Sequence, residues 1–176
     1  MADELRRMTE KDVLAVLHAS RTVEQGRPTA PDFSNVDLSG LDLRTVPFGR
    51  ACFRGGLLKD TDFSNADLSL TDFRQADLTG AKLIGTNLAD VDLRGAIVRD
   101  ANLCGACLFQ ADLRGSDMRG TLLDWADLGD VRVDEGTKVL PDQLTRARDV
   151  PASLLRVARA FQRKSALGNN PSGKGL

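Results

Sequence analysis

A five-residue period constrains this chain more than any other feature of its sequence. Stepping by five from Phe33 reaches a large apolar residue twenty-one times in succession, up to Val133, with no polar substitution. The position two residues earlier is usually small, with Ala at nine of the twenty-one units, and the position one residue earlier is Asp at eleven. A typical unit reads Ala66-Asp67-Leu68-Ser69-Leu70.

This period matches neither the 3.6-residue repeat of an α-helix nor the two-residue repeat of a β-strand. So strict a repeat favours a solenoid, in which each unit makes the same step. Both apolar side chains of a unit return to one interior if the backbone turns a corner after each unit and closes a four-sided coil of twenty residues. Successive coils would pair as parallel strands about 4.8 Å apart. The expected core includes the central residues Phe33, Phe48, Phe53, Phe63, Leu68, Phe73, Leu88, Leu108 and Leu128.

The tandem Ala-Asp/Asn-Leu-x-x units resemble the pentapeptide-repeat family over about three-fifths of the chain. The resemblance implies an all-β solenoid, namely a right-handed quadrilateral parallel β-helix, here of about five coils. Some members of that family resemble B-form DNA in shape and negative surface, and they protect DNA gyrase from quinolones or peptide toxins. The resemblance therefore implies DNA gyrase as one candidate partner.

The segments outside the period predict a short helix at each end. In the N-terminal segment, residues 1–30, Thr9 and Asp12 signal the start of a helix over residues 10–20, and Gly26-Arg27-Pro28 ends it. We expect this helix to cap the first coil of the repeats, residues 31–135, because an open coil exposes unpaired strand edges. A docking helix for a partner is the alternative.

The C-terminal helical segment, residues 136–167, has apolar residues at helical spacing over 152–165 and basic residues on the other side. Those basic residues are Arg156, Arg159, Arg163 and Lys164. The helix would cap the last coil or pair with its twin in a homodimer. Residues 168–176 are rich in Gly, Asn, Pro and Ser, and we expect a disordered tail there.

Charge is distributed unevenly along the chain, although the net charge is −1. Residues 31–135 contain eighteen acidic and eleven basic residues, whereas residues 136–176 contain two and eight. The basic end would dock internally or bind an acidic partner. Direct nucleic-acid binding is disfavoured because aromatic residues for base stacking are lacking. No stretch reaches the apolar length of a membrane span or of a signal peptide, so we expect a cytoplasmic protein with no membrane association.

Residues twenty apart would stack on one face, which defines two candidate surfaces. Arg54, Arg74, Arg94 and Arg114 would form a ladder beside a column of Asp residues. We interpret it as a self-neutralising lattice of ion pairs, each worth about 0–1 kcal/mol, with a phosphate-binding strip as the alternative. A second face has Arg50 as its only cation. The candidate interaction surface there comprises Asp67, Leu70, Asp90, Phe109, Trp125, Asp127 and Asp130, unless a terminal helix or loop covers it.

Residues able to support chemistry are few. Cys104-Gly-Ala-Cys107 has the spacing of a redox pair or half a metal site, but Cys52 and His18, the one histidine, lie far away in sequence. Structural zinc requires four ligands, so we expect no metal and no cofactor. One histidine outside the repeats also disfavours acid–base or triad catalysis. The sequence thus favours a non-catalytic, rigid scaffold for protein–protein interaction, with DNA mimicry as the alternative.

Overall fold

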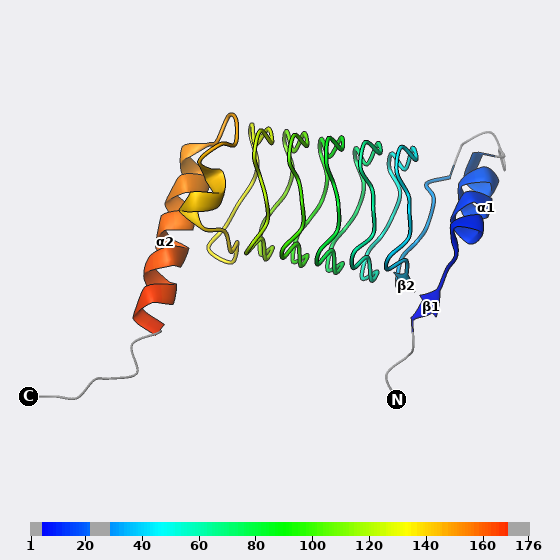
Figure 1. The fold of residues 1–176 in the computed structure, drawn as a ribbon, viewed down its shortest axis with the longest axis horizontal. Coiled ribbons are helices and arrows are strands. Elements are labelled where there is room, and N and C mark those ends of the chain that lie inside the picture. Colours follow the sequence, from blue (N-terminus) through cyan, green and yellow to red (C-terminus); the bar gives the residue numbers. More distant parts are fainter. Residues whose placement is uncertain (1–4, 22–28, 169–176) are drawn as a thin grey trace, which may run out of the picture.

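The protein is a rod of stacked coils with a helix at each end (Figure 1). The structure is a computed structural model that describes residues 5–21 and 29–168. Helix α1 (Glu10–Arg21) lies at one end and α2 (Ala152–Gly168) at the other. A short 3-10 helix, η1 (Pro141–Leu144), precedes α2 and packs against it.

Each coil takes twenty residues, as the five-residue period predicts. Parallel bridges join residues twenty apart, from Asp32 with Cys52 to Asp112 with Arg132. Since twenty residues are four units, each coil has four faces, which we label A to D from the units centred on Phe33, Leu38, Leu43 and Phe48. The fold is therefore a β-helical solenoid, although each bridge involves a single residue per strand.

Each of the twenty units from that of Phe33 to that of Leu128 ends in a tight turn whose last residue has a left-handed backbone. All twenty of these corner residues, every fifth residue from Asn35 to Asp130, have φ between 52° and 74°. The turn closes with a hydrogen bond such as that from the Ala51 amide to the Phe48 carbonyl, at 2.7 Å. Glycine adopts positive φ freely and Asn or Asp tolerates it, which explains why these residues predominate at the corners.

The central residues fill the inside of the rod. All of them from Phe33 to Leu128 are at most 2% exposed, and Val133 is partly buried. The phenylalanines gather in the first coils, where the ring of Phe53 stacks on those of Phe33 and Phe73 at centroid distances of 5.2 and 4.8 Å. Buried threonines at the small-residue position donate hydrogen bonds to carbonyls, as Thr61 does to Leu38 at 2.9 Å.

The N-terminal segment covers the edge of the first coil. Strand β1 (Arg6–Arg7) pairs in parallel with β2 (Val36–Asp37), which belongs to face B. Helix α1 then buries Val13 and Leu17 against the core, while Leu14 is exposed. The helix begins with a capping arrangement in which the Thr9 amide donates to Asp12 Oδ2 at 2.8 Å and the Asp12 amide donates to Thr9 Oγ1 at 3.3 Å.

The coil continues past Glu135, where the five-residue period ends. Asp117 pairs with Lys138 and Asp127 with Arg148, twenty-one residues apart, so one extra residue has entered the coil. Val139 and Leu144 then occupy the core. Helix α2 closes this end with Leu154 and Ala158, both at most 1% exposed.

Two expectations fall on residues that the structure leaves undescribed. The helix end proposed at residues 26–28 and the tail over 169–176 lie outside the described part of the chain. Within residues 5–21 and 29–168, no helix is long and apolar enough to cross a membrane.

Candidate interaction surfaces

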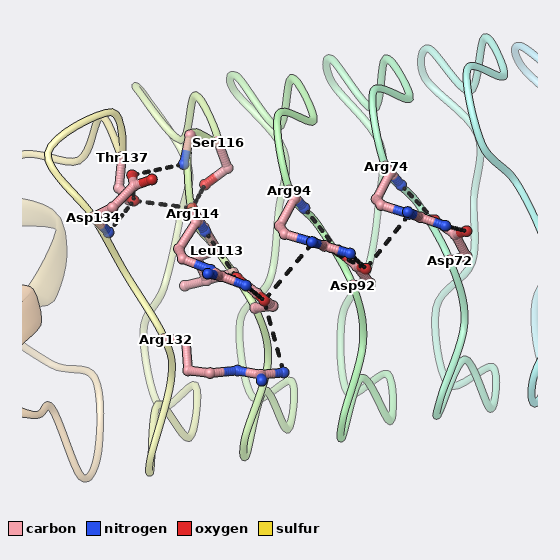
Figure 2. Close-up of polar contacts among 12 residues, drawn as sticks. Asp72, Arg74, Asp92, Arg94, Leu113, Arg114, Ser116, Arg132, Asp134 and Thr137 are labelled. Atoms are coloured by element: carbon pink, nitrogen blue, oxygen red, sulfur yellow. Dashed lines mark hydrogen bonds and ion pairs between the residues drawn. The ribbon is translucent and has the colours of Figure 1, made fainter.

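Face A carries a continuous ladder of ion pairs (Figure 2). Arg74 donates through Nη2 to Asp72 at 2.6 Å and approaches Asp92 of the next coil through Nε at 3.5 Å. Arg94 repeats this arrangement between Asp92 and Asp112, at 2.6 and 3.8 Å. Stacking places like residues in register every coil, so each carboxylate lies between guanidinium groups of two coils.

Two carboxylates act as hubs for several cations. Asp112, whose side chain is 4% exposed, contacts Arg94, Arg114 and Arg132 within 3.8 Å. The hydrogen bond from Arg114 lowers the pKa of Asp112 despite desolvation. On face B, Asp117 is surrounded by Arg99, Arg119 and Lys138.

The pKa of Asp117 is also lowered: burial opposes ionisation, but hydrogen bonds from Arg119 and Arg99 outweigh it. The ladder is not uniform, because desolvation raises the pKa of Asp72 against the attraction of Arg54. The arginines of the ladder are thus largely neutralised by their own aspartates. This geometry is that of an ion-pair lattice, and it leaves little net charge to attract phosphate.

The seven residues of the candidate interaction surface lie on face D and at its two edges. Asp67, Asp127 and Phe109 belong to face D itself, whereas Leu70, Asp90 and Asp130 share one corner column and Trp125 stands at the opposite corner. The C–D corner column comprises Thr45, Asn65, Gly85, Gly105 and Trp125. The D–A corner column comprises Arg50, Leu70, Asp90, Gln110 and Asp130.

The acidic residues of this surface have different roles. Asp67 and Asp127 each accept a hydrogen bond from the amide two residues later, at 3.1 and 2.9 Å, so they support the local turn. The backbone of Asp127 forms a parallel bridge with that of Arg148, which places on face D a second cation that the period did not predict. Among the described residues, no hydrogen bond or ion pair engages the carboxylates of Asp90 and Asp130, and both are exposed. Within the described residues, the carboxylates of Asp90 and Asp130 are therefore the acidic groups of this surface that are free to contact a partner.

Three large apolar side chains of this surface face solvent. Trp125 is 65% exposed, Leu70 is 49% exposed and Phe109 is 41% exposed. The ring of Phe109 lies over Gly129 of the next coil, where an added Cβ would sit 3.0 Å from Cδ2. Neither α1 nor α2 covers these side chains in the described structure.

The D–A corner column borders two hollows. Leu70 and Arg50 line a hollow of about 730 Å³ together with Leu17 of α1. Asp90, Gln110 and Asp130 line a second hollow of about 320 Å³ together with Arg132 of face A. The column therefore presents an apolar residue near the N-terminal end of the rod and acidic residues further along.

Bulky corner residues are concentrated at the edges of face D. Glycine occupies three of five corners between faces A and B and three between B and C, but only two between C and D and none between D and A. The corners that are neither Gly, Asn nor Asp are Gln75, between A and B, and five at the edges of face D: Thr45, Arg50, Leu70, Gln110 and Trp125. A left-handed backbone costs such residues roughly 1–2 kcal/mol. Face D thus combines exposed apolar side chains with backbone strain.

Sequence reasoning missed part of the exposed apolar surface. Ile84 and Leu122, on face C next to the Trp125 corner, are 41% and 55% exposed. The signal was present, because Leu122 stands where most units have Asp or Asn. Cys52, Cys104 and Cys107 are unpaired and partly buried. In the described residues no three His, Cys, Asp or Glu side chains are grouped as metal ligands.

The repeats and the fold match known proteins. The model of the family described as pentapeptide repeats (8 copies) matches this chain at residues 57–95, 71–109 and 86–124. The chain is similar to a pentapeptide repeat protein of the Arabidopsis thaliana thylakoid lumen, with 29% identity over 84% of this chain and 98% of that one and a TM-score of 0.50. No curated protein matches.

Two other solved structures are similar to parts of this chain. HetL, a pentapeptide repeat protein involved in heterocyst differentiation regulation in Nostoc sp. strain PCC 7120, has 24% identity over 76% of this chain and a TM-score of 0.53. The chain spans 50% of the length of HetL. QnrB1, a plasmid-mediated fluoroquinolone resistance protein, has 26% identity over 61% of this chain and 54% of its own, with a TM-score of 0.45. Residues 57–124 are thus repeats of the pentapeptide-repeat family, and the chain has the solenoid fold of pentapeptide repeat proteins.

Proposed function

We propose that this protein is a non-catalytic scaffold that binds a protein partner on face D and its two corner columns. The observation that carries the proposal is the placement of Leu70 and Trp125. Both are large, exposed and apolar, and both stand at left-handed corners, with φ of 59° and 64°. Residues kept in an unfavourable backbone conformation are concentrated at functional sites.

The physical case for binding rests on the rigidity of the rod. The twenty buried central residues and the interstrand hydrogen bonds fix the backbone, so the side chains of face D have set spacings before a partner arrives. Preorganisation lowers the entropic cost of association. Aromatic residues such as Trp125 are also the residue type that most often dominates binding energy at interfaces.

The test uses substitutions that preserve the corner. In Leu70→Gly and Trp125→Gly the backbone keeps a residue suited to positive φ, so only the side chain is lost. Gln75→Gly is the matched control, because Gln75 has φ of 60° and lies between faces A and B. We expect immobilised wild-type protein and Gln75→Gly to capture the same partner from native cell extract, and the two face D variants to lose it. Capture that is equal in all four proteins would contradict the proposal.

Mimicry of DNA towards gyrase is the alternative, and the acidic balance of residues 31–135, eighteen acidic to eleven basic residues, favours it. The ladder on face A weakens it, since arginines alternate with the aspartates there. A gyrase supercoiling assay with quinolone, together with a gyrase pull-down, separates the two functions. Protection of gyrase that depends on Asp90 and Asp130 would support mimicry, and neither protection nor binding would eliminate it.

A further inference from the structure

Helix α2 presents a basic stripe that faces away from the rod. Its seventeen residues contain three arginines and one lysine and no acidic residue. Arg156, Arg159, Arg163 and Leu167 fall within about 80° of the helix circumference, opposite the buried Leu154 and Ala158. None of the ion pairs among the described residues involves these arginines, and Leu167 is 79% exposed.

The side chains of the D–A corner column are complementary in charge and polarity to the stripe of α2. Read from the C-terminal end of the rod, it presents Asp130, Gln110, Asp90 and Leu70 on successive coils. Coils are about 4.8 Å apart, so Asp130 and Leu70 are separated by about 14.4 Å. Among the described residues, no ion pair involves Asp90, Asp130 or the arginines of α2, although Arg132 lines the same hollow as the two carboxylates and Glu135 lines a hollow with Arg156.

The two patterns have similar spacing. Arg156 and Leu167 are eleven residues apart, which is about 16.5 Å along a helix, and Arg156 and Arg163 are about 10.5 Å apart. The latter compares with about 9.6 Å between Asp130 and Asp90. Long arginine side chains accommodate the remaining difference.

We propose that the stripe of α2 in one molecule docks along the D–A corner column of a second copy of this chain. Arg156 would then pair with Asp130, Arg163 with Asp90, and Leu167 would pack on Leu70. The contact is heterologous, because it joins two different surfaces. It rests on the proposed function in that the corner column is part of the binding face. A second copy is favoured over a nucleic acid because the acidic complement is on the same molecule.

The test is sedimentation of the full chain over a range of concentrations at low and high salt. We expect wild-type protein to self-associate at low salt and to dissociate at high salt. The corner variant Asp90→Lys/Asp130→Lys and the helix variant Arg156→Glu/Arg163→Glu should each weaken association by about tenfold or more. A mixture of the two variants should associate again, because each supplies the surface that matches the other. Asp60→Lys/Asp100→Lys is the control, since these exposed corner residues, with φ of 56° each, are also two coils apart but lie between faces B and C.

Several results would overturn the proposal. A wild-type protein that stays monomeric at all concentrations would do so, as would association that survives the corner variant, which would indicate helix–helix pairing. Binding of a DNA duplex that requires Arg156 and Arg163, without self-association, would assign the stripe to nucleic acid instead. If self-association fails while capture that depends on Trp125 persists, only this inference fails and the proposed function stands.

Discussion

Replacing Asp117 by Asn should destabilise the rod far more than the same change at Asp77. Both residues stand at the same repeat position in one column of face B, two coils apart. Asp117 accepts hydrogen bonds from Nε and Nη2 of Arg99 and of Arg119 at 2.6–2.8 Å, and Lys138 is 3.8 Å away. Asp77 forms a single ion pair among the described residues, with Lys59 at 3.2 Å.

The expected size follows from these contacts. Hydrogen bonds to a charged group each contribute about 1.5–3 kcal/mol, and an Asn amide would direct its own N–H groups at a guanidinium. The side chains of Arg99 and Arg119 are 45% and 42% exposed, so water recovers part of the loss. We therefore expect Asp117→Asn to lower the free energy of unfolding by roughly 2 kcal/mol, and Asp77→Asn by roughly 0.5 kcal/mol.

The difference between wild type and Asp117→Asn should depend on pH. Arg119 and Arg99 hold the pKa of Asp117 below its usual value despite burial. A depressed pKa contributes stability that is fully present above the unfolded value, about 3.9, and is lost as pH falls through the folded value. Other carboxylates titrate in both proteins, so the difference isolates Asp117.

Urea unfolding at neutral and acidic pH measures both effects, followed by circular dichroism and by the fluorescence of Trp125, the one tryptophan. We expect the difference between wild type and Asp117→Asn to be largest at neutral pH and to shrink below about pH 4. Equal destabilisation by the Asp117 and Asp77 substitutions at neutral pH would refute the claim that the contacts of Asp117 with several cations stabilise the rod. So would a difference that is unchanged in acid.

Other contacts give further expectations. Phe53→Ala should cost about 3–5 kcal/mol of unfolding free energy in urea titrations, because the ring is fully buried among four others, whereas Phe53→Leu should cost less, since Leu93 fills the same position of face A two coils later. Trp125→Gly should be more stable than Trp125→Ala by roughly 0.5–1 kcal/mol, since only Gly relieves the positive φ; the reverse order would show that the corner is unstrained. The carboxyl of Asp42, hydrogen-bonded by Arg44, should titrate by NMR with a pKa of about 2, and Arg44→Ala should return it towards about 3.9.

The five-residue period was sufficient to predict the coil because the core, small-residue and corner positions of the units all fit the same geometry. The central residues are large and apolar, the residue two before is small, and the residue two after tolerates positive φ at most units. A slip by one residue would place polar side chains inside, so the twenty-residue register has no close competitor. The burial of Leu68, Leu88 and Leu108, all at most 1% exposed, follows from that register.

The end of the coil could not be predicted by the same reasoning, because the signal there is local. One extra residue between Arg132 and Lys138 shifts the phase, so the strict five-residue period stops at Glu135 although the coil continues. Shifted by one residue, Thr137-Lys138-Val139 still has the small, outward and central residues of a unit. Thr137 is buried and donates to the Leu113 carbonyl at 3.0 Å (Figure 2), so the bond compensates for the polar side chain.

The sequence predicted which residues lie on the surface, but the five-residue period did not predict which of them bind a partner. Since the core fixes the backbone of every coil alike, an outward position is free to vary without changing the fold. Gly, Asn or Asp is the least strained choice at a corner, and the A–B and B–C corner columns have one of them at nine of their ten corners. Leu70 and Trp125 depart from that choice and also expose apolar area to water, so neither stability nor solubility explains them. A contact made by those side chains would explain both departures, and for this reason we propose face D as the interaction surface of the rod.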